Sequence, residues 1–395
     1  MKVAMIDPSL FTGRYDDSLC AALAQRGQDV TLHARPMRPT DAIEPRGYAY
    51  DPRFFPLGEA VGRIAGEGRA FRIVKGMEYL AAARLPLGKM ARAEIAHVQW
   101  MPLPAADARL IARLHAHMPL VHTVHNAKPF HGDGAAKAQR EGYDRLLSRF
   151  DALIVHVDAT RQALLERGHD AARIHLVSHP PMRLATATAD DIATVQAMGG
   201  APGAMPRILF FGTIRPYKGL DLLLDAALSL WCAGGRFEVA IAGKPFVDMD
   251  ALLAPIRAAG FADRLVLDLG FLTEGRLDAH LRRANILAFP YRHIDASGAL
   301  LTALHYGKPV LVSDTGLFAD LAARAEQPLL AAPPDDAAGL AASLLSLLRD
   351  AAMRRDFGER AVALDAILGS WDETAMATIA VYEAARSRWQ QGQVR

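Results

Sequence analysis

Short, continuous apolar runs recur along the chain, and helical patterns separate them. The first six runs are VAMID (3–7), VTLHA (30–34), AHVQW (96–100), LVHTVH (120–125), ALIVH (152–156) and IHLVSH (174–179). Strands covered on both faces need continuous hydrophobicity, whereas strands with one wet face alternate between apolar and polar residues. The runs therefore predict a parallel sheet with helical crossovers, which is an α/β domain.

The pattern starts again after residues 182–206, a segment that ends in a Gly/Pro cluster. The second set of runs is RILFFG (207–212), EVAIAG (238–243), RLVLDLG (264–270), ILAFPY (286–291) and PVLVSD (309–314). We predict an N-terminal α/β domain over 1–185, a linker over 186–206, a second α/β domain over 207–370 and a final helical segment over 371–395. Because ligands of open parallel sheets bind beyond the carboxyl ends of strands, the predicted active site is the cleft between the domains.

Composition narrows the possible classes of protein. Apolar residues make up 51% and charged residues 22%, which is typical of a soluble globular chain. A formal net charge of +2 argues against a nucleic-acid partner. No signal-peptide pattern and no run of about 18 apolar residues is present, so we expect a cytoplasmic protein without a transmembrane helix. Cys20 and Cys232 fall in apolar helical patterns and are predicted to be buried thiols.

The stretch FFGTIRPYKG (210–219) joins a buried strand to a helix. A loop of this kind exposes backbone amides and the positive end of a helix dipole, to which Arg215 and Lys218 add full charges. Together with Gly212 and Thr213, these residues suit a diphosphate. The alternative is two solvated cations in an ordinary surface loop.

A second loop from strand to helix lies in PYRHIDASGALLTALHYGKPVLVSD (290–314). Ser297 stands where a helix over 297–306 should begin, so it is predicted to cap that helix while nearby amides face a phosphate. An ordinary cap with a close-packed Gly298 is the alternative reading. Two such loops on one sheet edge favour an anion site.

The first domain offers histidines instead of cations. His122, His125 and His131 follow one another in HTVHNAKPFHG (122–132), but strand alternation sends His122 and His125 to opposite faces, so we predict no zinc site. His125, at the carboxyl end of the strand, is the candidate active-site residue. Only Gly13 precedes the first helix, so the three-glycine dinucleotide fingerprint is absent and no nicotinamide or flavin cofactor is predicted.

Four pieces of the sequence resemble the retaining family-4 glycosyltransferases of the GT-B architecture. They are FFGTIRPYKGLDLLLDA (210–226), FLTEGRLDAHLRRANILAFPY (271–291), GALLTALHYGKPVLVSD (298–314) and SWDETA (370–375). The resemblance implies two Rossmann-like domains facing a deep cleft, with the C-terminal helix crossing back to the N-terminal domain. It also implies a nucleoside-diphosphate sugar on the second domain and no required metal, since cations and helix ends stabilise the departing diphosphate.

The resemblance assigns site residues by their place in the motifs. The implied catalytic residues are His125, Arg215, Lys218 and Asp295. The implied donor-binding residues are Gly212, Thr213, Arg215, Lys218, Ser297, Gly298, Ala299, Leu300 and Thr302, and the implied acceptor-side residues are Gly13, Arg14, Tyr15 and Asn126.

The acidic pair of the family is altered in this chain. The family usually carries two glutamates separated by seven residues, whereas here Asp295 lies nearest the first position and Thr302 stands at the second. A hydroxyl cannot accept two ribose hydroxyls as a carboxylate does, so ribose binding is expected to differ. Retention of configuration is the family expectation. An inverting enzyme would need a base from the first domain, for which Asp16, Asp17 and His125 are the candidates.

The segment 61–92 holds seven Lys/Arg against two Glu, interleaved with apolar residues. Such a basic amphipathic stretch predicts peripheral contact with anionic lipid, and a solvated helix face is the alternative. We therefore expect a UDP- or GDP-sugar donor and a glycan or lipid-linked acceptor, as in bacterial surface or exopolysaccharide synthesis, at the inner face of the membrane. Two other functions remain open: a noncatalytic homologue that binds a sugar nucleotide or a partner, and a sugar-nucleotide epimerase.

Overall fold

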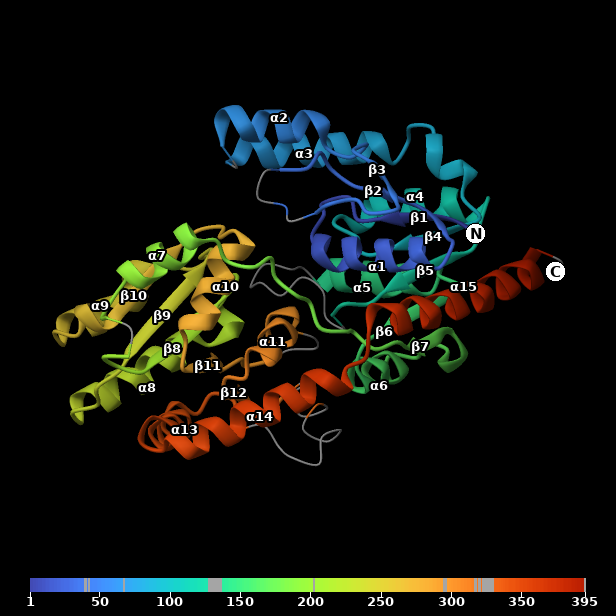
Figure 1. Ribbon diagram of the computed structural model, residues 1–395. Coiled ribbons are helices and arrows are strands. Elements are labelled where there is room, and N and C mark those ends of the chain that lie inside the picture. The colour runs from blue at the N-terminus through green and yellow to red at the C-terminus, as the bar shows by residue number, and fades with distance from the viewer. Residues whose placement is uncertain are drawn as a thin grey trace. The chain divides into compact units, whose positions relative to one another are not determined.

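The computed structural model describes residues 1–395 apart from 39–40, 42, 67, 127–136, 202, 294–296, 316–317, 319–320, 322–329 and 394–395. The chain forms two compact units. Unit 1 comprises Met1–Pro180 and Ser370–Arg395, and unit 2 comprises Pro181–Gly369. Each unit is a parallel sheet flanked by helices (Figure 1), as the apolar runs predict.

Unit 1 contains a seven-stranded sheet in the order β3-β2-β1-β4-β5-β6-β7. The strands are β1 (Lys2–Ile6), β2 (Asp29–His33), β3 (Ala49–Asp51), β4 (Ile95–Val98), β5 (Leu120–Thr123), β6 (Ala152–Val155) and β7 (Ile174–Leu176). The helices are α1 (Gly13–Gln25), α2 (Pro56–Ala65), α3 (Arg69–Ala82), α4 (Pro104–His115), α5 (Lys137–Leu147), α6 (Asp158–Glu166) and α15 (Trp371–Gln393). The strand order reverses beside β1, which places a topological switch point at the carboxyl ends of β1 and β4.

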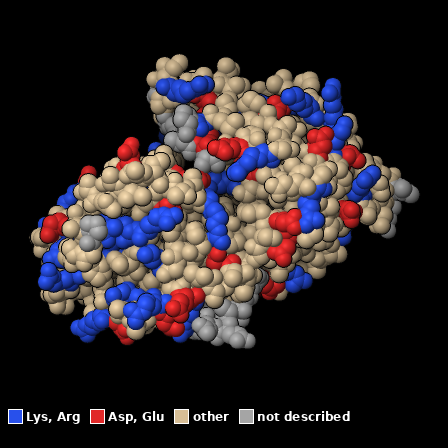
Figure 2. All heavy atoms as spheres, in the orientation of Figure 1, with Lys and Arg blue, Asp and Glu red and all other residues tan. Residues whose placement is uncertain are grey.

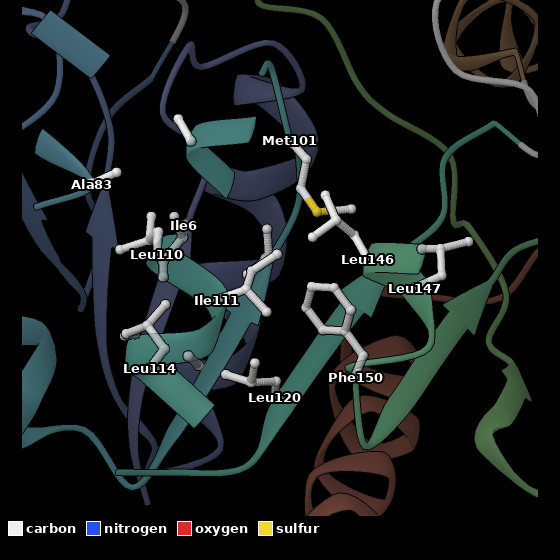
Figure 3. Close-up of a cluster of buried hydrophobic side chains, with 14 of the residues drawn as sticks. Ile6, Ala83, Met101, Leu110, Ile111, Leu114, Leu120, Leu146, Leu147 and Phe150 are labelled. Atoms are coloured by element: carbon white, nitrogen blue, oxygen red, sulfur yellow. The ribbon is translucent and has the colours of Figure 1, made fainter. Parts of the chain in front are cut away.

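Burial on both faces explains the continuous apolar runs of unit 1. Every residue of β4, β5 and β6 is buried. Figure 3 shows how Leu110, Ile111 and Leu114 of α4 gather with Phe150 over one face of the sheet. Burying such a side chain stabilises the fold by about 1.5–3 kcal/mol, so this layer fixes the strand ends that carry the polar residues described below.

The last helix returns to unit 1, as the resemblance implies. The Thr374 hydroxyl of α15 donates to the carbonyl of Ser178 (3.0 Å), and the Trp389 indole donates to the carbonyl of His115 (2.9 Å). Asp372 forms an ion pair with Arg26, next to the end of α1. Figure 1 shows α15 running beside α1. The C-terminal segment is therefore an integral layer of unit 1.

Unit 2 contains a six-stranded sheet in the order β10-β9-β8-β11-β12-β13. The strands are β8 (Arg207–Phe211), β9 (Glu238–Gly243), β10 (Leu265–Leu269), β11 (Ile286–Phe289), β12 (Val310–Ser313) and β13 (Leu330–Ala332). The helices are α7 (Ala189–Ala197), α8 (Leu220–Cys232), α9 (Met249–Ala258), α10 (Glu274–Arg283), α11 (Gly298–Ala303), α13 (Ala337–Arg349) and α14 (Ala351–Ile367). The predicted helix 297–306 is α11 followed by the 3-10 turn η5 (Leu304–Tyr306).

Two features differ from the sequence predictions. The segment predicted as a linker, 186–206, belongs to unit 2 and contains α7, which a capping box between Thr188 and Asp191 starts. Cys20 is buried as predicted, but Cys232 is exposed, because it is the last residue of α8 and the apolar stripe of that helix ends one residue earlier, at Trp231. None of the helices in the described part of the chain is long and apolar enough to cross a bilayer.

Candidate active site

The loop from β8 to α8 holds the two predicted cations close together. After Gly212 the chain passes through the 3-10 turn η3 (Pro216–Lys218), in which the Lys218 amide donates to the Arg215 carbonyl (3.0 Å). The loop is tied to the end of β9, since the Ile214 amide donates to the Lys244 carbonyl and the Phe246 amide donates to Ile214, both at 2.8 Å. Arg215 and Lys218 therefore lie on a loop that hydrogen bonds hold to the end of β9.

Two glycines shape this loop for steric reasons. Gly219 adopts φ +67°, and a Cβ there would lie 1.9 Å from the Pro290 carbonyl oxygen, so any side chain would push α8 away from β11. Gly212 adopts φ +95°, and a Cβ there would lie 3.3 Å from Lys218 Nζ. The glycines allow the backbone to approach closely and leave room around the lysine amine.

Lys218 is a buried cation that has no anionic partner in the described part of the chain. Its side chain is only 7% exposed, and no carboxylate or other hydrogen-bond acceptor contacts its amine among the residues that the structure describes. Burial first, and then the positive charge of Arg215, lowers the pKa of Lys218 to about 8. Burying a charge without a partner is unfavourable, so an anion bound here would relieve a cost that the free protein carries.

Arg292 holds the loop between β8 and α8 in place through hydrogen bonds. The sequence analysis did not identify this residue. Its guanidinium donates to the Pro216 carbonyl (2.9 Å) and to both carboxylate oxygens of Asp221 (2.8 and 2.6 Å). It also donates to Asp335 (2.6 Å), and its backbone amide donates to the Tyr217 carbonyl (2.8 Å). The hydrogen bonds to Asp221 raise the pKa of Arg292 and lower that of Asp221. Arg292 thus positions the turn that carries Lys218.

The second loop follows β11, the neighbour of β8 in the sheet, and leads to the start of α11. Ser297 caps α11 as predicted, because its hydroxyl accepts the Leu300 amide (3.2 Å). That bond occupies Leu300, which leaves the amides of Gly298 and Ala299 as the candidates for a ligand. The Thr302 side chain is buried, and its hydroxyl donates to the Gly298 carbonyl (2.8 Å), so it stabilises its own helix. Asp295 lies outside the described residues.

Tyr291, which follows β11, is a further buried polar residue near Lys218. Its side chain is 1% exposed, and its hydroxyl has no hydrogen-bond partner among the described residues. Lys218 Nζ lies 5.3 Å from the centre of its ring. Burial, and then the neighbouring Tyr217, raise the pKa of the Tyr291 hydroxyl. Nothing in the sequence around Tyr291 marked this position.

In unit 1, His125 stands at the carboxyl end of β5 within a chain of hydrogen bonds. Its Nε2 lies 2.9 Å from Gln99 Oε1, which can only accept, so Nε2 carries the proton. The Gln99 amide nitrogen lies 3.3 Å from His97 Nε2, and His97 Nδ1 lies 2.8 Å from the Tyr382 hydroxyl of α15. Burial, and the neighbouring His156 and His179, hold the pKa of His125 well below its usual range. His125 is thus a neutral, oriented imidazole.

The acceptor-side residues of unit 1 do not all face solvent. The Tyr15 side chain is buried among the rings of His125, His156 and His179, each with its centre 5.0–5.2 Å away. Gly13 is close-packed, since a Cβ there would lie 2.9 Å from Ile43. Arg14 and Asn126 are half-buried. Tyr15 therefore packs against these three histidines inside unit 1.

The acidic candidates for an inverting base are engaged inside unit 1. Asp16 is buried beside Asp7, and its carboxylate accepts the Thr12 hydroxyl (3.3 Å). Burial and the charge of Asp7 raise the pKa of Asp16. Asp17 accepts the hydroxyl of Tyr48 (2.5 Å).

The strand alternation predicted for the histidines is confirmed. His122 Nδ1 donates to the Val98 carbonyl (2.7 Å), and the His122 ring lies near Phe150 of one core, whereas His125 contacts Tyr15 of the other. Within the described ranges no group of three His, Cys, Asp or Glu side chains is placed to hold a metal ion. His131 lies outside those ranges.

Two family models match the chain, one for each unit. The model described as "Glycosyl transferase 4-like domain" matches residues 12–180, and the model described as "Glycosyl transferases group 1" matches residues 205–350. The first match falls within unit 1 and ends at Pro180, where the first segment of that unit ends. The second falls within unit 2 and contains both loops of the candidate site.

The chain is also similar to proteins whose names state an activity. A D-inositol 3-phosphate glycosyltransferase of Kineococcus radiotolerans is 30% identical over 68% of this chain and 66% of its own length. A GDP-mannose:glycolipid 4-beta-D-mannosyltransferase of Xanthomonas campestris is 27% identical over 67% of this chain and 65% of its own length. These matches span slightly less than two thirds of the relatives. The solved structure of Anabaena Alr3699/HepE, in complex with UDP and glucose, has a TM-score of 0.71 at 15% identity and covers 96% of this chain and 99% of its own, which indicates the same fold.

Proposed function

We propose a reaction for this chain from the premise that it belongs to the GT-B glycosyltransferases. In this reaction it transfers a sugar from a UDP- or GDP-linked donor to a glycan or lipid-linked acceptor. The observation that carries this proposal is Lys218, a buried ammonium group beside Arg215 with no anion near it among the described residues. A donor diphosphate supplies the missing negative charge. In transfer it also leaves with that charge, so the same two cations stabilise the departing group.

The donor residues divide the work of binding. Arg215 and Lys218 neutralise the diphosphate, while the amides of Gly298 and Ala299 at the start of α11 are oriented toward it by the Ser297 cap. Gly212 and Thr213 supply the close backbone approach at the end of β8. Because the Thr302 hydroxyl is bonded within α11, we assign it no ribose contact. No metal ion is needed in this scheme.

On the side of unit 1, we propose that His125 contacts the transferred sugar as a neutral imidazole, with Gln99 and His97 fixing its orientation. We propose retention of the anomeric configuration. Of the three candidate bases for inversion, Asp16 and Asp17 are buried and accept hydrogen bonds within unit 1, so inversion would depend on His125.

The acceptor proposal draws on the relatives. One is named for a glycolipid acceptor and a GDP-mannose donor, and another for an inositol phosphate acceptor. A lipid-linked or glycan acceptor, as in bacterial surface polysaccharide synthesis, is consistent with the former name. Such an acceptor would place the protein at the inner face of the cytoplasmic membrane.

The test of the proposed function is a thermal-shift panel followed by a turnover assay. Because a ligand that binds only the folded state raises its stability, UDP or GDP should raise the melting temperature of unit 2, whereas uridine and guanosine should not. The nucleotide that gives the larger shift identifies the donor class, and donor hydrolysis or transfer should follow with that donor.

The panel also separates the two other functions. Binding of a nucleoside diphosphate without hydrolysis or transfer of the donor would favour a noncatalytic homologue. Conversion of the donor sugar with no acceptor present would favour an epimerase. The absence of any shift with either nucleoside diphosphate would contradict the proposed donor site.

Tyr291→Phe should weaken donor binding without destabilising the protein. We expect the Tyr291 hydroxyl to donate to the diphosphate, so its loss should cost about 1–3 kcal/mol of binding free energy, or roughly 5-fold to 150-fold in Kd. The free protein loses no hydrogen bond with it, since the hydroxyl has no partner there among the described residues. Calorimetric Kd values and melting temperatures of the two proteins check this. An unchanged Kd would remove Tyr291 from the site.

A further inference from the structure

A network of four polar side chains connects the C-terminal helix α15 to His125 inside unit 1. The Tyr382 hydroxyl of α15 lies 2.8 Å from His97 Nδ1, and His97 Nε2 lies 3.3 Å from the Gln99 amide nitrogen. Gln99 Oε1 lies 2.9 Å from His125 Nε2. Tyr382, His97 and Gln99 are completely buried, so their polar atoms depend on one another for hydrogen-bond partners. We call these four residues the Tyr382–His125 network.

Strand geometry brings the network to one face of the sheet. His97 and Gln99 lie two residues apart at the end of β4, and Thr123 and His125 lie two residues apart at the end of β5. Side chains two residues apart on a strand share a face, and β4 and β5 are parallel neighbours. Helix α15 packs on this face, where the Tyr382 ring meets the His97 ring edge to face with their centres 5.5 Å apart.

Both imidazoles of the network are neutral, so each carries a single ring proton. Burial, and then the neighbouring His122 and His156, lower the pKa of His97 to about 3. Burial, and then His156, hold the pKa of His125 well below its usual range. Figure 2 shows Lys, Arg, Asp and Glu side chains spread over the visible surface, whereas the network consists of uncharged side chains. The positions of the ring protons therefore decide which of its atoms donate and which accept.

The Gln99 amide fixes the positions of these protons. Its nitrogen lies 3.0 Å from Met5 Sδ, a weak acceptor, and 3.3 Å from His97 Nε2. An amide nitrogen only donates, so His97 Nε2 accepts. The ring proton of His97 is therefore on Nδ1, which donates to the Tyr382 hydroxyl. On the other side of the amide, Gln99 Oε1 accepts the proton of His125 Nε2.

Turning the Gln99 amide over would reverse every hydrogen bond of the network. The amide oxygen would accept from His97 Nε2 and the amide nitrogen would donate to His125 Nε2, so the His125 proton would lie on Nδ1. The Thr123 hydroxyl, 2.7 Å from His97 Nε2, can donate or accept and fits both arrangements. The reversed amide would place its oxygen against Met5 Sδ, which offers no proton. The observed arrangement is therefore the favoured one while Tyr382 supplies an acceptor to His97 Nδ1.

We propose that Tyr382 is a positioning residue that keeps the ring proton of His125 on Nε2, acting through His97 and Gln99. The Tyr382 hydroxyl accepts the proton of His97 Nδ1, which leaves His97 Nε2 as an acceptor for the Gln99 amide. Gln99 then presents its oxygen to His125, and His125 Nδ1 is unprotonated. For its effect on sugar transfer this inference rests on the proposed function, in which His125 contacts the transferred sugar.

The test is nitrogen NMR of the full chain containing isotope-labelled histidine, because protonated and unprotonated ring nitrogens have well-separated chemical shifts. His97→Gln and His125→Gln assign the signals of the two rings. In the wild-type protein the proton should lie on Nδ1 of His97 and on Nε2 of His125. Tyr382→Phe leaves the buried Nδ1–H of His97 without its acceptor, which should shift the tautomer ratio of His125 toward Nδ1–H by roughly 5-fold to 150-fold.

Two further variants show whether the effect passes through the network. Tyr50→Phe removes another tyrosine hydroxyl of unit 1, which donates to the Arg35 carbonyl outside the network, and should leave the His125 tautomer unchanged. Gln99→Met interrupts the network with a side chain of similar length. In that background Tyr382→Phe should no longer move the His125 proton, since residues that act through a shared partner lose their coupling when it is removed.

Four results would overturn the inference. They are a wild-type His125 protonated on Nδ1, an unchanged tautomer in Tyr382→Phe, an equal change in Tyr50→Phe, and a change that persists in the Gln99→Met background. The first of these requires no variant at position 382, so misfolding of Tyr382→Phe does not protect the proposal.

The turnover assay measures the effect of the tautomer on transfer. Tyr382→Phe should lower kcat by about tenfold, the worth of one hydrogen bond to the sugar, while the thermal shift with UDP or GDP persists because the cation loops are in unit 2. An unchanged kcat with a switched tautomer would contradict the positioning role. The NMR measurement uses no donor, so failure of the donor site and failure of this inference are distinguishable.

Discussion

Lys218→Ala should remove most of the donor affinity and, with it, turnover. Truncating one of two cations that clamp a diphosphate at a buried site costs about 2–5 kcal/mol, which corresponds to a loss of roughly 30-fold to 5,000-fold in Kd. The effect should appear in both Kd and kcat/KM, since the same charge stabilises the departing diphosphate. Calorimetry with UDP and GDP, and initial rates with the donor that binds, measure the two quantities.

The control for this prediction is Arg257→Ala, which removes an exposed cation of α9 that pairs with Asp250. Arg257→Ala lowers the net charge of unit 2 by the same amount as Lys218→Ala. If only Lys218→Ala loses donor affinity, the loss is therefore not a general effect of net charge. Lys218→Ala with intact Kd and turnover would move the donor site elsewhere. Loss of folding is a separate outcome, and circular dichroism of the variant detects it. The Lys218 amine is buried and has no partner among the residues that the structure describes, so its truncation removes an unfavourable desolvation and we expect the variant to fold.

The pH dependence of binding follows from the same residue. Burial and Arg215 lower the pKa of Lys218 to about 8 in the free protein, so the amine loses its proton as pH rises through that value. Only the charged amine pairs with a diphosphate. Donor affinity should therefore fall above pH 8, by up to about tenfold per pH unit. Lys218→Arg should bind with a flatter pH profile, because a guanidinium stays charged throughout this range.

The apolar runs were enough to predict both sheets, because strands buried on two faces leave a continuous signal. The same signal fails for β3 and β13, which have three residues each and only partial burial. Helix α7 was missed for a different reason: Val195 is its one buried residue, so it shows almost no periodicity, and its capping box is the local feature that starts it. Its place in unit 2 depends on tertiary contacts that no local pattern encodes.

The candidate site divides in the same way. The place of Arg215 and Lys218 in a loop between a strand and a helix, and the Ser297 cap, were predictable, because such a loop has local features that a sequence displays. The contacts of Tyr291 and Arg292 were not predictable, since they depend on how the end of β11 meets the loop that follows β8. The position of Asp295 falls outside the described residues, so the altered acidic pair stays a prediction.

Buried histidines should make unit 1 sensitive to acid. Burial lowers the pKa of His97 to about 3 and those of His122 and His156 to about 4. An unfolded chain binds protons at these residues near pH 6.5, whereas the folded chain does not until far lower pH. The unfolded state therefore gains protons first as pH falls, and each such histidine costs about 2 kcal/mol of stability by pH 5. Above pH 6.5 both states are neutral and the effect vanishes.

Carboxyl groups in the same unit act in the opposite direction. Burial raises the pKa of Asp107 to about 7, and burial also raises those of Asp7 and Asp16, so the folded state takes up these protons first and gains stability as pH falls. The net change in stability of the wild-type protein at acid pH is the loss caused by the histidines minus the gain caused by these carboxyl groups. A variant that changes only the histidines isolates their share, because the carboxyl groups are common to both proteins.

The double variant His122→Asn, His156→Asn should lose about 4 kcal/mol less stability than the wild-type protein between pH 7.5 and pH 5. Each imidazole donates through Nδ1 to a backbone carbonyl, of Val98 (2.7 Å) and Val177 (2.9 Å), and an asparagine amide nitrogen can replace that donor. Urea unfolding of unit 1, followed at a series of pH values, gives the two slopes. His117→Asn, on the exposed surface, should leave the slope as it is. Parallel profiles for the double variant and the wild type would mean that the imidazoles of His122 and His156 are protonated alike in the folded and unfolded states. The burial of these two side chains would then carry no electrostatic cost.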